Sequence, residues 1–231
     1  MIQEPERISL AGENSLIIYF SEQPDKYTSA RIAIVKTILY KTLGSFIVDM
    51  IPSYVSLFIS WDPLTVDYRI FKKKVSKCLK GIPHEQSELA GNLIELPVYY
   101  SPSTGPDLES LAAKKQLSIE KLIKIHHNCE YRVFAIGFAP GFAYLGEVDE
   151  RISGPRRSSP RLHVPAGSVG IAGRQTAIYP SSSPGGWNII GRCPVQLFSP
   201  IKDDGVKFCI ADRVRFFSID REEYLAFGGN P

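Results

Sequence analysis

Three arginines, Arg156, Arg157 and Arg161, lie close together on one short loop that also holds two prolines. The planar guanidinium group presents a rigid fork of N–H donors that matches a carboxylate or a phosphate. The loop holds no acidic residue that would neutralise these charges. We therefore expect an anion site here, for a substrate carboxylate, a carboxyphosphate-like species or an acidic face of a partner. The alternative is a solvated loop with one arginine paired structurally.

Aromatic residues stand beside two glycine turns on either side of this loop. Phe142 and Tyr144 follow a Pro-Gly pair, and Trp187 follows a Gly-Gly pair, within a stretch dense in glycine and proline, residues 137–192. Such turns let the backbone approach a ligand, and an aromatic ring beside them can wall a pocket or an interface. A packed corner, or a tryptophan that plugs the end of a barrel, would give the same pattern, so both interpretations stay open.

The other reactive side chains give weaker signals. His126 falls on the apolar stripe of a helix, which predicts a hydrogen-bonded core histidine, whereas His163 follows the arginine loop and is the better candidate for proton chemistry. Ser168 lacks the first glycine of a nucleophile elbow, and Cys193 has no visible base. The glycine-rich residues 167–173 lack the Lys-Ser/Thr of a phosphate loop. We expect no metal site, because His, Cys, Asp and Glu do not occur at ligand spacing.

Strand and helix patterns alternate in the first part of the chain, residues 1–90. Their order, β-α-β-β-α-β, predicts an α+β domain of the ferredoxin-like type, with two helices over one face of an antiparallel sheet. A polar break at residues 84–91 precedes the last strand, which can pair with this sheet or with the next domain. The predicted elements are residues 15–20, 25–43, 47–51, 55–60, 62–81 and 92–100.

The second part, residues 91–231, changes character along its length. Two short helices are predicted at residues 106–116 and 118–127, with Asp107 and Ser118 as N-caps. Beyond Tyr131 short apolar runs alternate with Gly/Pro turns, which is typical of an all-β barrel or sandwich. The sequence thus predicts an α+β protein whose second domain is a β-barrel.

The bulk composition excludes several function classes. The chain has 231 residues and a net charge of only +3, which gives no basis for nucleic-acid binding. It shows no signal peptide and no apolar run long enough to span a bilayer. Its four cysteines are widely spaced, which favours reduced thiols and a cytoplasmic location. The lysines of residues 72–80 lie on the polar face of a helix, ordinarily a solvated face.

Four long segments carry a resemblance to a known family: GFAPGFAYLG, PRRSSPR, VPAGSVGIAGRQTAIYP and SPGGWNIIGRCPVQLF. In this order they resemble the family of 5-oxoprolinase B subunits, also called KipI-like or allophanate hydrolase subunit 1, and the similarity covers essentially the whole chain. Ala177, Cys193 and Ala143 depart from the residues usual in the family. The resemblance implies a small α+β domain followed by a cyclophilin-like β-barrel, which together form carboxyltransferase subdomains C and D.

The resemblance also implies a function. Family members act with the A and C subunits of 5-oxoprolinase to convert 5-oxo-L-proline and ATP, with Mg²⁺, to L-glutamate, and we expect this chain to be inactive alone. We expect a substrate-binding site with one role for each group of residues. Arg156, Arg157 and Arg161 would stabilise anionic groups, Gln175 and Tyr179 would orient the substrate by hydrogen bonds, and Phe142, Tyr144 and Trp187 would shape the pocket. The alternatives are an inhibitor of a sensor histidine kinase and a carboxyltransferase-like component of a urea carboxylase.

Overall fold

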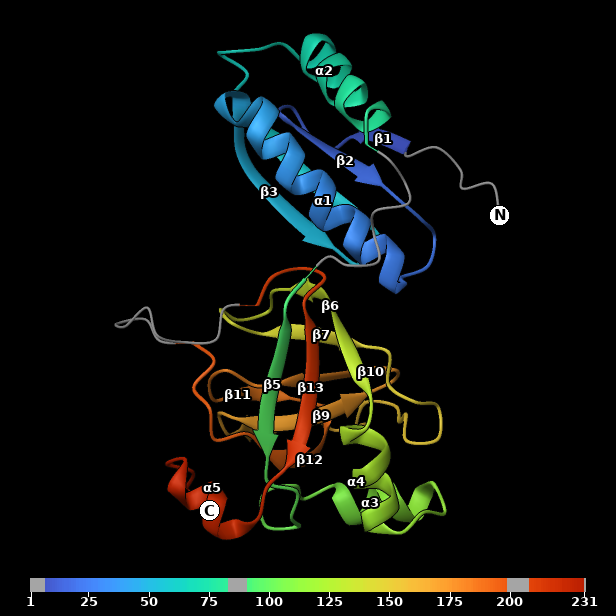
Figure 1. Cartoon of the computed structure of the whole chain (residues 1–231), viewed down its shortest axis with the longest axis vertical. Coiled ribbons are helices and arrows are strands. Elements are labelled where there is room, and N and C mark those ends of the chain that lie inside the picture. Colours follow the sequence, from blue (N-terminus) through green and yellow to red (C-terminus); the bar gives the residue numbers. More distant parts are fainter. Residues whose placement is uncertain (1–6, 83–90, 199–207, 231) are drawn as a thin grey trace. The chain divides into compact units, whose positions relative to one another are not determined.

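The chain divides into two compact units, Met1–Asn92 and Leu93–Pro231 (Figure 1). The computed structural model describes residues 7–82, 91–198 and 208–230, so the predicted polar break at 84–91 lies outside the described residues except for Gly91. Each unit has a hydrophobic core of its own. None of the described helices combines the length and the apolarity that crossing a bilayer requires.

The N-terminal unit is a four-stranded antiparallel sheet with two helices on one face (Figure 1). Asp25 and Asp67 each accept two backbone N–H bonds at the start of a helix, which satisfies donors that have no partner within the helix itself. The apolar stripes of both helices pack on the sheet around the buried rings of Trp61 and Phe71. The elements are β1 (Arg7–Leu10), β2 (Ser15–Tyr19), α1 (Lys26–Leu43), η1 (Gly44–Phe46), β3 (Ile47–Ser53), β4 (Ser56–Trp61) and α2 (Tyr68–Lys80).

The N-terminal unit does not contain the last strand of the predicted ferredoxin-like βαββαβ order, the strand whose pairing the sequence left open. The sheet order is β1-β2-β4-β3, and the edge beside β2 is taken by β1, a short strand that the sequence pattern did not predict. The strand expected there, β5 (Leu93–Val98), pairs instead in the C-terminal unit, in parallel with β13 (Arg213–Ser218). Residues far apart in sequence decide this pairing, so the local pattern of either strand does not reveal it.

The C-terminal unit is a seven-stranded sheet that closes on itself as a barrel. The strand order is β12-β9-β10-β7-β6-β13-β5, and Tyr99, directly after β5, exchanges two backbone hydrogen bonds with Arg192 at the end of β12. The remaining strands of this sheet are β6 (Glu130–Ile136), β7 (Ala143–Gly146), β9 (Ser168–Ala172), β10 (Gln175–Ile178) and β12 (Asn188–Arg192). The predicted second-domain barrel is therefore present.

The described residues of this unit also form three helices and a two-stranded ribbon. Helices α3 (Leu108–Lys114) and α4 (Ile119–His127) pack together, and their apolar residues join the barrel core (Figure 1). The ribbon consists of β8 (Arg161–Val164) and β11 (Ser183–Gly185), and α5 (Arg221–Ala226) follows β13. Ser118 caps α4 as predicted, but the Asp107 side chain makes no cap bond at α3.

His126 lies in the barrel core, where the sequence predicts a hydrogen-bonded histidine. It is fully buried, and its two ring nitrogens lie 2.8 Å from the Tyr100 hydroxyl and 3.0 Å from the Thr176 hydroxyl. Its ring stacks on Phe216. Burial, with a smaller effect of His127, lowers the pKa of His126 to about 3. The imidazole is therefore neutral at physiological pH and serves the core rather than proton transfer.

Candidate functional site

The arginine loop is anchored by a buried carboxylate from a distant part of the chain. Asp107 is 2% exposed, and it accepts one bond from Arg157 Nη1 at 2.7 Å and two from Arg161 at 2.8 Å. Its Oδ2 also accepts the backbone N–H of Ile189 at 2.7 Å. The loop, α3 and β12 are thus tied together at one point. Asp107 is the acidic partner that the loop itself lacks.

The charge balance at this point stays positive. Burial opposes ionisation of Asp107, but bonds from Arg161 and the Ile189 amide, with the charges of both arginines, hold its pKa below the ordinary value. One carboxylate faces two guanidinium groups there. Arg156 is exposed, and it makes no hydrogen bond or ion pair with any residue that the structure describes. Arg157 and Arg161 are therefore fixed in position, whereas Arg156 is available to an external anion.

Four of the predicted pocket residues form one aromatic cluster. Phe142 lies at its centre, with ring centroids 4.9 Å from Tyr144, 5.5 Å from Tyr179 and 5.8 Å from Trp187, all in edge-to-face arrangements. Phe142, Tyr179 and Trp187 are buried and Tyr144 is half-buried. The cluster packs against β8 through Val164, on the opposite side of the sheet from the barrel core. Trp187 thus packs into this cluster and does not plug a barrel end.

The ribbon of β8 and β11 brings the arginine loop to this cluster. Gly185 pairs with Arg161 across the ribbon, and the Arg157 amide donates to the Gly186 carbonyl at 2.7 Å. A Cβ at Gly185 would collide with the Tyr179 hydroxyl, so glycine is required for this close approach. The two glycine turns and the loop, separate in sequence, are therefore neighbours in the fold.

Tyr179 connects the aromatic cluster to the arginines. Burial raises its pKa, although the Trp187 amide, which donates to its hydroxyl oxygen, and the charges of Arg156 and Arg161 act in the opposite direction. The phenol therefore stays protonated and can donate a hydrogen bond next to two positive charges. Donors grouped in this way are suited to an oxygen that carries or develops negative charge.

Replacing Tyr179 with phenylalanine tests this connection. We expect Tyr179→Phe to lower the free energy of unfolding by about 1 kcal/mol, because the Trp187 amide loses its acceptor while the ring packing is kept. Urea unfolding of the two proteins measures the difference. Tyr27→Phe is the control, because its ring is 41% exposed and we expect no measurable loss. Equal stability of Tyr179→Phe and the parent chain would contradict the hydrogen bond from the Trp187 amide to the Tyr179 hydroxyl.

Gln175 is not part of the aromatic cluster. It begins β10, where its Cα partners are Ala172 and Gly146, and alternation places it on the same sheet face as Ala177 and Tyr179. At about 3.3 Å per residue it starts about 13 Å from Tyr179 along the strand. Ala177 itself is buried within β10. A ligand that touches both Gln175 and Tyr179 must extend along the sheet.

The other candidate residues have no catalytic geometry. Ser168 begins β9 rather than a helix, and its Oγ is buried without a hydrogen-bond partner among residues 7–82, 91–198 and 208–230. Burial raises the pKa of Cys193 to about 12, so this thiol is not a nucleophile at neutral pH. His163 is exposed on β8 beside Arg161. The described residues contain no group of three His, Cys, Asp or Glu side chains that could hold a metal ion.

The glycine-rich residues 167–173 do not form a nucleotide-binding loop. They comprise a turn and strand β9, and the amides of Gly167 and Gly173 donate to the carbonyls of Tyr179 and Gly154. A phosphate cradle requires such amides to be unbonded and turned toward the ligand. This segment therefore does not fit ATP.

Comparison with known proteins places the chain in a family. A family model described as carboxyltransferase domain, subdomain C and D, matches residues 6–208. The chain is 36% identical to the 5-oxoprolinase B subunit of Bacillus subtilis, covering 96% of each, and 41% identical to that of Escherichia coli, covering 75% of this chain and 82% of the relative. The crystal structure of TTHA0988 superposes with a TM-score of 0.78 at 33% identity, covering 89% of this chain. The chain spans only 40% of TTHA0988. With these matches, the chain belongs to the family of 5-oxoprolinase B subunits and carries carboxyltransferase subdomains C and D.

Proposed function

We propose that this chain is the B subunit of an ATP-dependent 5-oxoprolinase that converts 5-oxo-L-proline to L-glutamate. Its relatives in Bacillus subtilis and Escherichia coli carry that name over most of their length. The observation that supports a role in the reaction is that Tyr179, a member of the Phe142 aromatic cluster, is influenced by the positive charge of Arg156. We propose that the chain acts in the cytoplasm with the A and C subunits, is inactive alone, and contributes its barrel as the family's cyclophilin-like module.

The arrangement suits a small lactam that bears a carboxylate. The ring of 5-oxoproline carries three tetrahedral carbons beside its planar amide, so its apolar edge can lie against the aromatic cluster. Ring opening by water places negative charge on the lactam oxygen, and the Tyr179 hydroxyl and the Arg156 guanidinium are donors for such an oxygen. Arg157 and Arg161, held by Asp107, fix the loop that carries Arg156. Gln175 extends the polar part of the site along β10.

ATP and Mg²⁺ are cofactors of the proposed reaction, but the glycine-rich segment of this chain does not fit a nucleotide. The glycine-rich segment has its end amides bonded in the barrel, and no carboxylate cluster offers a place for a metal ion within the described ranges. We therefore assign no nucleotide step to this chain. Its own residues bind and orient the lactam and stabilise charge on its oxygen, while the nucleotide would be bound mainly by the partner proteins.

A single variant tests the proposed role of Arg156. In the complex reconstituted with the A and C subunits, we expect Arg156→Gln to lower kcat/KM for 5-oxo-L-proline about 100-fold, as loss of one charge-stabilising donor does in other enzymes. Its exposed side chain makes no contact that folding needs, so stability should not change. Arg151→Gln is the matched control, because Arg151 is an exposed arginine bound to Asp149. Unchanged turnover by Arg156→Gln would exclude the role.

The same reconstituted complex separates the proposal from a carboxyltransferase function, which the description of the matching family model makes the second candidate. Carboxyl transfer from added carboxybiotin to urea, without glutamate formation from 5-oxo-L-proline, would support that alternative.

A further inference from the structure

One turn beside the aromatic cluster holds a phenylalanine in a strained backbone conformation. Phe138 has a φ of +75°, in the left-handed region that bulky side chains rarely adopt. Two other non-glycine residues with positive φ occur in the part of the chain that the structure describes, Gln116 and Ala211. Gln116 follows the end of α3, where many helices adopt this conformation, and Ala211 is small. Phe138 is therefore the unusual member of this set.

Backbone hydrogen bonds hold this turn in place. The Gly137 amide donates to the Phe142 carbonyl at 3.1 Å, and the Phe142 amide donates to the Ala139 carbonyl at 3.0 Å. Gly141 also has a positive φ, and a Cβ there would collide with a neighbouring side chain. The strain at Phe138 persists because these contacts determine the backbone around it.

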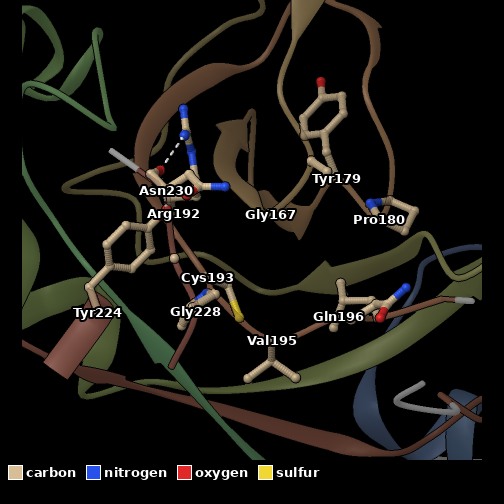
Figure 2. A pocket seen from close by; sticks show the side chains of 14 residues that line it. Gly167, Tyr179, Pro180, Arg192, Cys193, Val195, Gln196, Tyr224, Gly228 and Asn230 are labelled. Carbon is tan, nitrogen blue, oxygen red and sulfur yellow. Dashed lines mark hydrogen bonds between the residues drawn. The ribbon is translucent and has the colours of Figure 1, made fainter. Parts of the chain in front are cut away.

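Burial of the ring does not compensate for this strain. Phe138 is 67% exposed. Gly141 of the same turn lies close to Pro180 and Leu197, which line a cavity of about 330 Å³ (Figure 2). Phe138 does not line this cavity, so its ring is not used to fill it. A strained residue with an exposed aromatic ring costs stability, and backbone strain of this kind is concentrated at ligand sites.

The Phe138 ring borders the site that we propose for the lactam. Its centroid lies 5.4 Å from that of Phe142, with an angle of 68° between the ring planes. The centroid of Phe142 lies in turn 5.5 Å from that of Tyr179, whose hydroxyl is assigned to the lactam oxygen. Phe138 and Tyr179 thus contact the same central ring. Because the Phe138 ring is mostly exposed, it can present a face to a ligand that lies on the cluster.

We infer that Phe138 is the outer wall of the lactam site and packs on the apolar edge of 5-oxo-L-proline, an inference that rests on the proposed function. The three tetrahedral carbons of the lactam ring supply the apolar surface that a phenyl face covers. These carbons do not gain charge during ring opening, so the contact binds the ground state and the transition state equally. Loss of such uniform binding raises KM and leaves kcat unchanged.

Two variants separate the ring of Phe138 from its backbone strain. Phe138→Ala removes the ring but keeps a side chain at positive φ, whereas Phe138→Gly removes both the ring and the strain. In the complex reconstituted with the A and C subunits, both variants should raise KM for 5-oxo-L-proline about tenfold without lowering kcat. The melting temperature of the full chain should be about 3 °C higher for Phe138→Gly than for Phe138→Ala. An unchanged KM, or equal melting temperatures of the two variants, would overturn the inference.

Two further variants serve as controls. Phe138→Tyr keeps the aromatic ring and should keep the parent KM, which a requirement for small size at this position would not allow. Phe227→Ala removes a phenylalanine of the same unit that is 55% exposed and has an ordinary φ of −75°, so KM should not change. A rise in KM for Phe227→Ala equal to that for Phe138→Ala would contradict a specific role of Phe138.

A binding measurement distinguishes failure of this inference from failure of the proposed function. Calorimetric titration of the same complexes with 5-oxo-L-proline, without ATP, should show about tenfold weaker binding by Phe138→Ala than by the parent. If the parent complex releases glutamate while Phe138→Ala keeps both KM and affinity, the wall is overturned and the proposed function stands. If the parent complex neither binds 5-oxo-L-proline nor releases glutamate, both are overturned. Loss of assembly by Phe138→Ala in size-exclusion chromatography would assign the ring to a partner contact and overturn the wall.

Discussion

Replacing Asp107 with alanine is expected to lower the free energy of unfolding by about 3 kcal/mol, the low end for removing one partner of a buried ion pair. The change leaves the Ile189 amide without its acceptor and places two guanidinium groups side by side without a counter-charge. Arg157 and Arg161 would then no longer fix the loop. Turnover of the reconstituted complex should fall together with stability, and urea unfolding and glutamate release measure the two effects.

Two controls separate the buried anchor from a surface pair. Asp149→Ala removes a carboxylate bound to Arg151, whose side chain is 61% exposed, and should cost about 1 kcal/mol or less because water screens such pairs. Asp107→Asn keeps the side-chain shape but removes the charge. Its free energy of unfolding should therefore lie between those of the parent chain and Asp107→Ala. If Asp107→Ala lowers the free energy of unfolding no more than Asp149→Ala does, the role of Asp107 as the anchor of the arginine loop is contradicted.

The stability of the barrel should depend on pH through His126. Burial lowers the pKa of this histidine to about 3 in the folded chain, whereas an unfolded chain has the ordinary value of about 6.5. Between these values the unfolded state binds the extra proton, so this contribution to stability is present above about pH 6.5 and is lost as the pH falls toward about 3. Between about pH 7 and pH 5 the loss should be about 2 kcal/mol.

The histidine contribution is measured as a difference between two proteins. Between about pH 7 and pH 5, urea unfolding should show that the free energy of unfolding of the parent chain falls by about 2 kcal/mol more than that of His126→Gln. This difference does not depend on the stability of the variant at neutral pH. His127→Gln, the neighbouring and half-buried histidine, serves as the control and should keep the full loss. If both variants and the parent chain lose the same amount, His126 is not a buried neutral group in the folded chain.

Features with a local cause could be predicted from the sequence. The apolar stripe of residues 119–126 places His126 in the core, and Ser118 caps the same helix, because both depend on residues within a few turns. The barrel is indicated by many short apolar runs between Gly/Pro turns. By contrast, β1 has four residues of mixed exposure, which is too little pattern for a prediction.

Features decided by distant residues could not be predicted in this way. Asp107 has the position of an N-cap, but its carboxylate is used by Arg157 and Arg161, 50 and 54 residues away. Similarly, β5 has the pattern of a strand, and only its pairing with β13 shows that it belongs to the barrel. Arg192 lies at the end of an ordinary strand, and its bond to the Asn230 carbonyl appears only when the C-terminal segment is placed beside it.

We propose that this chain is a required component of a 5-oxoprolinase. The most direct test is ATP-dependent release of L-glutamate from 5-oxo-L-proline by the A and C subunits, assembled with and without this chain. We expect turnover only when the chain is present, and none from the chain alone. Equal glutamate release by the A and C subunits without it would contradict the claim.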